Sequence, residues 1–231
     1  TALGCFSSSV SGITTPADVE LCVLAGDFSI EQTILVMGTA RLTATNGSIR
    51  QTAAGTINAQ NLGLWAGGQI LLDLASNNIA GHMAAWSAAG NIQLQEVDGF
   101  TVGTITAGDC LPESSGLSAA SGDLSVTTGG ELTIGNGGGQ DIRAAGHTVE
   151  IQAAGVRAAT GSIIEAAELS LQGAGDFRLE QDNAVDMLAA NLDGPLIYRN
   201  ADSLILGTVI GLRGLTTLDA DVKLTLDTGN L

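Results

Sequence analysis

The chain has 231 residues, 24 of them acidic and 8 basic, so its net charge at neutral pH is −16. Nucleic acids and anionic lipid surfaces attract clustered Lys and Arg, which this sequence lacks, so we expect neither as a partner. No uninterrupted run of about 18 apolar residues occurs, which argues against membrane insertion as a helix.

Short stretches that alternate apolar with polar or small residues follow one another, with the period of two that marks a strand with one buried face. In chain order they are GDFSIE (26–31), ARLTAT (40–45), GSIRQT (47–52), GTINAQ (55–60), NLGLWA (61–66), GQILLDL (68–74), NIQLQE (91–96), GFTVGTI (99–105), DLSVTT (123–128) and ELTIGN (131–136). Gly, Asn, Asp and Ser separate them and suit tight corners. Only residues 79–86 and 184–191 could pass for helices, and both lie among strands. The sequence therefore predicts an all-β fold.

A β-solenoid fits this composition better than a sandwich or a barrel. Aromatic residues make up only 3% of the chain, and the Asn-Gly and Asp-Gly pairs typical of antiparallel hairpins are often missing between the strands. In a solenoid each coil stacks about 4.8 Å above the last, so aliphatic side chains form ladders inside a narrow tube. At roughly twenty residues a coil, we expect about eleven coils and a rod on the order of 50 Å long.

The chain also repeats itself over a longer distance. Residues 78–105 align without a gap to residues 182–209 and agree at seven positions, among which are Asp98/Asp202 and Gly103/Gly207. Weaker similarity on both sides predicts a single solenoid of about two and a fifth long repeats, approximately 1–107, 108–210 and 211–231. Because it begins and ends inside a unit, we expect a slice of a longer array. The four matched residues are expected to be structural corner residues, with each aspartate closing an Asx-turn at a strand entrance.

Three cysteines occur, Cys5, Cys22 and Cys110, with no zinc-ligand spacing. Cys5 and Cys22 are separated by about one coil and would pair in an oxidising compartment. The alternative is that all three are small buried hydrophobic side chains. The sequence leaves both open.

No constellation of residues indicates catalysis, a cofactor or a metal. The basic residues are scattered singly, and carboxylates such as Glu96 and Asp98 are expected on solvent-facing turns. His82 and His147 have no other ligand type at a suitable spacing. The rings of Trp65, Trp86 and Tyr198 would suit sugar stacking, but we expect them to cap the core or cover a corner of a coil.

The order NGSIRQTAAGTINAQNLGLWAGGQILL (46–72), NNIAGHMAAW (77–86) and GNIQLQEVDGFTVGTI (90–105), followed by SGLSAASGDLSVTTGGELTIG (115–135), resembles the repeat region of filamentous-haemagglutinin-like bacterial exoproteins, of the two-partner-secretion or autotransporter type. This resemblance extends over nearly the whole chain. It implies a right-handed parallel β-helix, located outside the outer membrane of a Gram-negative bacterium.

The resemblance further implies a non-catalytic structural or adhesive stalk segment. It does not supply a binding partner; as a separate expectation, the partner is host-surface or matrix carbohydrate or protein. Open strand edges at the ends of a solenoid also predict end-to-end self-association. Two alternatives stay open. One is a self-assembling extracellular filament, sheath or matrix subunit, and the other is a β-helix enzyme that degrades polysaccharides.

Overall fold

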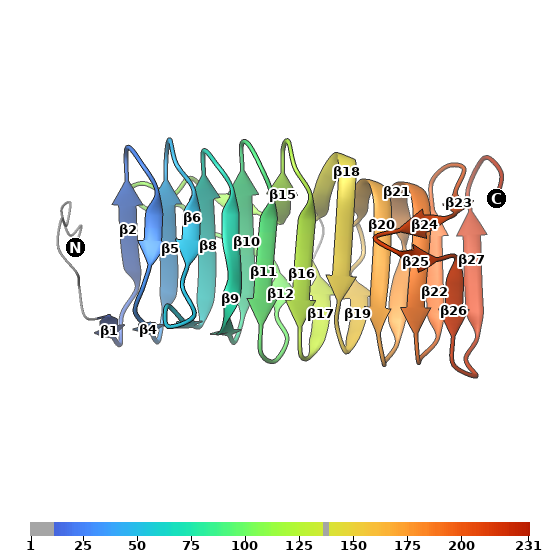
Figure 1. Cartoon of the computed structure of the whole chain (residues 1–231), viewed down its shortest axis with the longest axis horizontal. Helices are drawn as coiled ribbons and strands as arrows, with labels where there is room; N and C mark the ends of the chain where they lie inside the picture. The colour runs from blue at the N-terminus through green and yellow to red at the C-terminus, as the bar shows by residue number, and fades with distance from the viewer. Residues whose placement is uncertain (1–11, 136–138) are drawn as a thin grey trace.

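The computed structural model describes residues 12–135 and 139–231, which form a right-handed parallel β-helix of about ten turns. The strands advance along one axis from β1 to β27 (Figure 1). The predicted all-β solenoid is confirmed. In the described part of the chain no helix is long and apolar enough to cross a membrane.

The strands stack on three faces, which we call A, B and C. Face A contains β2 (Val19–Val23), β5 (Thr39–Ala44), β8 (Asn61–Ala66), β10 (His82–Ser87) and β15 (Leu117–Ala119). Face B contains β3 (Phe28–Ile30), β6 (Ile49–Gln51), the start of β9 (Ile70–Ile79), β11 (Ile92–Glu96), β16 (Leu124–Thr128) and β26 (Leu215–Thr217). Face C begins with β1 (Ile13–Thr15), β4 (Ile34–Val36) and β7 (Ile57–Ala59), and its second half contains β17 (Glu131–Ile134), β19 (Gly155–Ala158), β22 (Leu196–Asn200) and β27 (Val222–Leu226).

Longer strands bend from one face to the next. They are β9, β18 (Ile142–Gln152), β20 (Ile164–Gly173) and β21 (Phe177–Leu192). The two-residue strands β12 (Thr101–Val102) and β23 (Ile205–Leu206) precede two short antiparallel hairpins. These hairpins pair β13 (Thr104–Ile105) with β14 (Ser114–Ser115) and β24 (Thr208–Val209) with β25 (Leu212–Arg213).

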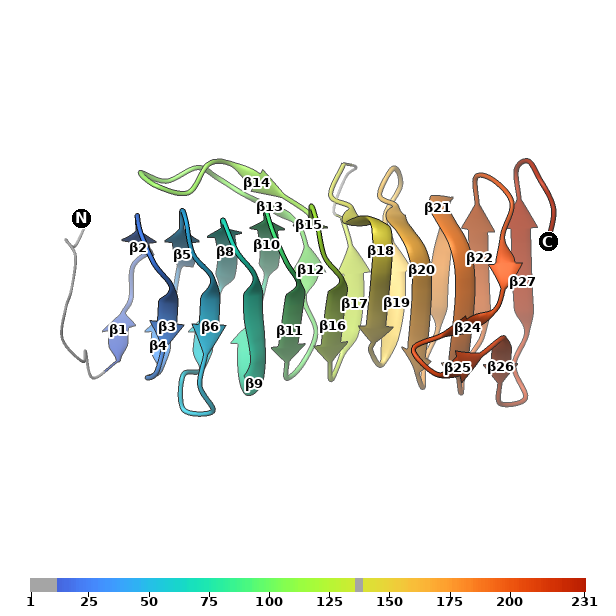
Figure 2. The ribbon, with the colours of Figure 1, turned by 45° about the horizontal axis from the view of Figure 1, so that its top comes forward.

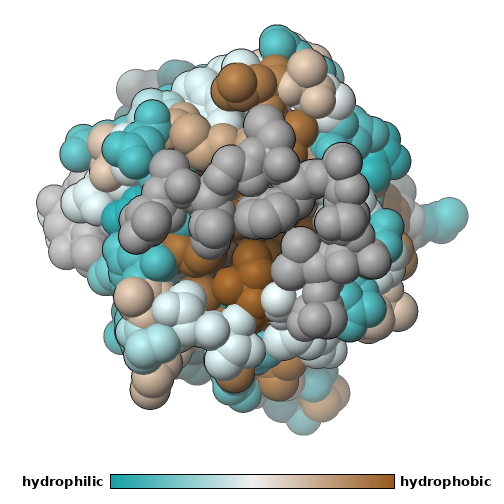
Figure 3. All heavy atoms as spheres, turned by 90° about the vertical axis from the view of Figure 1, so that its left-hand side faces the viewer, coloured by the Kyte–Doolittle hydropathy of each residue, from teal (hydrophilic) through white to brown (hydrophobic). Residues whose placement is uncertain are grey.

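The parallel register places like side chains above one another. Leu21 pairs with Leu42, Leu42 with Leu64 and Leu64 with Ala85, and all four are buried. These positions are 21 or 22 residues apart, close to the expected coil length. About ten turns form in the described chain where eleven were expected, and residues 103–116, which leave the stack, add no coil. Seen from the β1 end, apolar side chains lie at the centre of the rod and hydrophilic ones around it (Figure 3).

Polar side chains are buried at two bends of the tube. Asn77 and Glu96 are stacked at the bend from face B to face C, and their side-chain oxygens accept the backbone N–H groups of Ile57 and Ile79. Asn183 and Asn200 are stacked at the bend from face C to face A and accept those of Ile164 and Val185; we call this second pair the polar column. Each bond joins one coil to the coil before it, so both pairs satisfy backbone donors where the strands bend and fix the coils in register.

Glu96 corrects an expectation from the sequence. Its side chain does not lie on a solvent-facing turn, since the residue is only 3% exposed and stacks on Asn77 at the buried bend from face B to face C. Burial raises the pKa of its carboxyl group, and the N–H groups of Ile79 and Asp98 and the hydroxyl group of Thr128, which donate to it, offset this only in part.

Candidate functional site

The two aligned segments, residues 78–105 and 182–209, each end where the chain leaves the stack. Gly103 and Gly207 each donate a backbone bond to the preceding coil, at Met83 and Leu188, before a hairpin begins. A Cβ atom at Gly103 would collide with the His82 ring, and one at Gly207 with the side chain of Met187. Close approach to the His82 ring therefore favours glycine at 103, whereas the flexible Met187 side chain could shift to admit a Cβ atom at 207.

The first excursion, residues 103–116, is called the strap. It begins at Gly103 and ends at Gly116, whose N–H donates to the Gly103 carbonyl (3.0 Å) and whose carbonyl accepts from Ala85 (3.0 Å). Between these points the strap runs back over face A toward β2 (Figure 2). One loop thereby contacts several coils at once, whereas strands of a solenoid contact only their neighbours.

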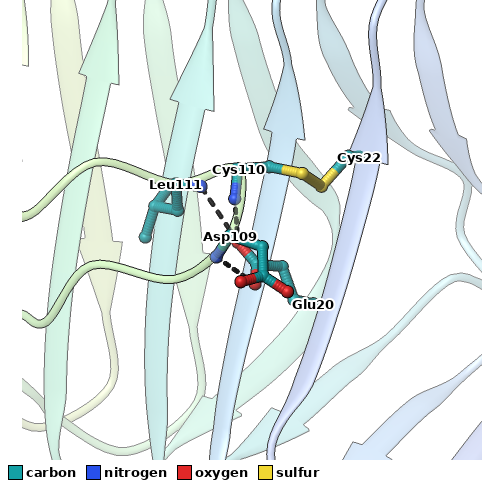
Figure 4. The surroundings of a disulfide bond; sticks show 5 residues. All are labelled: Glu20, Cys22, Asp109, Cys110 and Leu111. Atoms are coloured by element: carbon teal, nitrogen blue, oxygen red, sulfur yellow. Dashed lines mark hydrogen bonds between the residues drawn. A yellow bond between two sulfur atoms is a disulfide. The ribbon is translucent and has the colours of Figure 1, made fainter. Parts of the chain in front are cut away.

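The tip of the strap is held by the carboxylate group of Glu20 on β2. The backbone N–H groups of Asp109, Cys110 and Leu111 all point at it, with N···O distances of 2.8, 2.7 and 2.9 Å (Figure 4). Three successive N–H groups form a concave anion site. Burial alone would raise the pKa of Glu20, but these three donors together with Arg41 hold it below its usual value.

Arg41 on β5 pins the strap one coil further along. Its Nε donates to the Thr106 carbonyl (3.0 Å) and its Nη2 to the Thr106 hydroxyl (3.0 Å), while Nη1 pairs with Asp18 (2.9 Å). The Arg41 side chain is 12% exposed. The guanidinium fork thus bridges β2, β5 and the strap with all three of its donor nitrogens.

Apolar side chains fasten the middle of the strap. Ile105 and Leu111 are buried and pack over Gly63 on β8 and Ala84 on β10, whose small side chains leave room for them. Trp65 lies beside this cluster and stacks on the next rung against Trp86, with ring centroids 4.0 Å apart. The two indoles thus form an aromatic ladder on the outer side of face A.

A disulfide bond joins Cys22 on β2 to Cys110 in the strap, across 88 residues of sequence. The expected pairing of Cys22 with Cys5 is therefore wrong, and Cys5 lies outside the described residues. Sequence spacing suggested neighbouring coils, but it cannot reveal a loop that folds back. Glu20, Cys22 and Cys110 lie close enough to hold a metal, yet both sulfurs are in the disulfide and the carboxylate faces three N–H donors. This arrangement suits a structural crosslink.

The second excursion, residues 207–214, is called the second hairpin. It lies over β20 and β21 on face B (Figure 1), and buried Val209 takes the place that Ile105 has in the strap. Its tip residue Ile210 is 57% exposed with φ 46° and stands beside a hollow of about 210 Å³. No cysteine occurs in the second hairpin. The two excursions share a base but differ at the tip.

The repeated aspartates occupy matching bends after β11 and β22. Asp98 accepts a bond from the side chain of Asn78 (3.5 Å) and Asp202 one from Thr228 (2.8 Å). The bonds described for both carboxylates thus come from side chains on neighbouring coils and not from backbone groups of an Asx-turn. They tie corners together between coils.

The remaining candidates lie apart from the strap tip. Tyr198 is fully buried and donates to Asn200 (3.1 Å), and burial raises the pKa of its hydroxyl group. The Nδ1 atom of His147 lies 3.9 Å from the Oδ1 atom of Asp123, and His82 packs at the base of the strap.

Three of the eight basic residues, Arg157, Arg178 and Arg199, lie on face C, although they are scattered in the sequence. Arg157 and Arg178 are adjacent in register, and each pairs at 3.4 Å with an exposed carboxylate, Glu131 and Asp176 respectively. Arg199, two residues beyond the register partner of Arg178, contacts Asp227 at 2.6 Å. The spacing of 21 residues between Arg157 and Arg178, which equals one coil there, is the signal that could have revealed their alignment.

Fold and site together define a parallel β-helix whose first coils are bridged by a disulfide-anchored strap. Comparisons with protein-family models, with curated proteins and with solved structures find no match to this chain.

Proposed function

We propose that this chain is a structural, adhesive stalk segment of a secreted or surface-exposed bacterial fibre, comparable to the shafts of filamentous-haemagglutinin-like exoproteins. The observation that carries the proposal is the continuous parallel stack from β1 to β27, reinforced by the strap. Such a stack transmits load through many parallel hydrogen bonds and extends by adding coils. A disulfide bond also suits a location outside the cell, beyond the Gram-negative outer membrane.

Surface charge supports a stalk more than an enzyme. The three arginines of face C are each paired with exposed carboxylates, whereas glycoside hydrolysis needs two carboxyl groups flanking a substrate site. Host-surface or matrix carbohydrate or protein remains the proposed partner. A survey of polysaccharide substrates for release of reducing ends tests this point, and any turnover by the purified chain would overturn the non-catalytic proposal.

A self-assembling filament subunit is the second candidate. In the described chain β26 and β27 have a paired strand on one side only, and Val222 and Leu218 are 42% and 65% exposed. An open edge of this kind invites a further strand. Electron microscopy of the purified protein separates the two: single rods of about 50 Å support a shaft segment, and long fibres that grow with concentration support a filament subunit.

A further inference from the structure

A solenoid is expected to unfold from its ends, because each coil contacts only its neighbours. The strap breaks this rule at one end of the rod. It connects β2 to the segment between β12 and β15, so that β2 cannot separate from β5 while the strap stays bound. β5, β8 and β10 lie between these two points of attachment.

Among the described residues, the second hairpin does not restrain its coils in the same way. The second hairpin contacts a column of side chains that matches the one under the strap: Ala189, Ser170 and Glu150 stand where Ala84, Gly63 and Arg41 stand on face A. Its tip carries neither a cysteine nor three N–H groups on a carboxylate, and Ile210 stands exposed beside a hollow. Beyond it, the inward-facing Leu224 and Leu226 of β27 are only partly buried.

We propose that Glu20 and the Cys22–Cys110 disulfide form a two-part clasp, which closes the coils from β2 to β10 into one unit that opens later than the coils outside it. Glu20 is a positioning residue in this clasp. Its carboxylate holds the N–H of Cys110 itself, together with those of both neighbours, and so brings the sulfur of Cys110 to Cys22 before the bond forms. The clasp does not depend on the rod being a stalk.

Closing the clasp is a two-electron oxidation. The thiols of Cys22 and Cys110 lose two electrons and two protons as their S–S bond forms, and a small disulfide such as oxidised glutathione is reduced to two thiols. The docked strap raises the local concentration of one thiol near the other, which favours the bond. Reduction leaves the strap held by Glu20, Arg41 and the apolar contacts alone.

Hydrogen exchange resolved by strand tests the order in which the coils open. In the oxidised protein, amides of β5 and β8 should exchange at least tenfold more slowly than after reduction, while those of β27 should not change. The Cys22→Ser/Cys110→Ser variant should match the reduced protein, and Cys5→Ser serves as the matched control that should match the oxidised one. Equal exchange of β5 and β8 in the two redox states, or an equal change at β27, would overturn the clasp.

A thiol–disulfide equilibrium tests Glu20 separately and does not depend on folding of the serine variants. In glutathione buffers, Glu20→Gln should lower the equilibrium constant for Cys22–Cys110 formation about tenfold, because the amide lacks the charge that three N–H groups face. Glu113→Gln, which changes an exposed carboxylate on the strap itself, is the matched control and should leave the constant unchanged. If both variants keep the wild-type constant, Glu20 has no positioning role.

Discussion

The polar column at the corner of the tube gives a sharp test of what holds the coils in register. Asn183 is fully buried, and its side-chain oxygen accepts the N–H of Ile164 (2.9 Å). Its amide nitrogen donates to three carbonyl groups, those of Leu179, Gln181 and Arg199, at 3.0, 3.1 and 2.8 Å. We predict that Asn183→Ala leaves all four backbone groups without this partner.

The expected loss follows from these contacts. An orphaned buried donor costs about 2 kcal/mol, and a carbonyl group that loses one of its bonds costs about 0.5 kcal/mol. Because the Asn183 amide has two hydrogens to share among the three carbonyls, one donor and two carbonyl bonds give a loss of about 3 kcal/mol in the free energy of unfolding. For a chain of this size, that corresponds to a decrease of about 6–12 °C in melting temperature.

Thermal melts followed by far-UV circular dichroism measure this decrease. Asn191→Ala is the matched control, because Asn191 lies on the same strand β21 with its side chain exposed. Its effect should stay within about 0.5 kcal/mol. If the two variants melt within 2 °C of each other (roughly 0.5–1 kcal/mol), the polar column does not stabilise the corner as argued.

Three further predictions concern the buried acid and the strap. Because the folded state raises the pKa of Glu96, the wild type should gain stability as pH falls from neutral toward about 4.5. Thermal melts at pH ~7 and ~5 measure this gain. Glu96→Gln should abolish the gain and should be no less stable than the wild type at neutral pH. The lowered pKa of Glu20 predicts the opposite pH dependence: its hydrogen bonds to the strap persist from neutral pH to about 5 and weaken as pH falls through a folded pKa below about 4.3. The fluorescence of the stacked Trp65–Trp86 pair in reduced protein should therefore change only below about pH 4. A change near pH ~6 would contradict Glu20 as the titrating group. Gly63→Val should push Ile105 and Leu111 off β8 and destabilise the strap by about 1–3 kcal/mol, which a lower oxidised fraction in glutathione buffer would reveal; an unchanged fraction would show that the contact is not tight.

Much of the rod was predictable because it depends on local pattern. The alternation in residues 40–45 and 61–66 identified β5 and β8, and the coil length of 21 or 22 residues between them and β2 is close to the expected one. Gly103 and Gly207, which were expected at corners within the coil, lie at the bases of hairpins.

The site was not predictable, because it depends on contacts distant in sequence. The pairing of Cys22 with Cys110 requires knowing that residues 103–116 fold back over face A, and no periodic signal records the direction of a loop. Glu96 was misjudged for a different reason. A charged residue at the end of a strand usually faces water, and only its register with Asn77 places it at the buried bend from face B to face C.

The long repeat sets how protrusions are distributed around the rod. Gly103 and Gly207 are 104 residues apart, yet the strap emerges on face A and the second hairpin on face B. One unit is therefore not a whole number of coils, and each copy is rotated by about one face relative to the last. A further unit obeying the same rule would project its hairpin from face C, so that successive projections follow a helical path around the axis. Two such rods could lie flush only when offset along their length, so that the projections of one fit between those of the other.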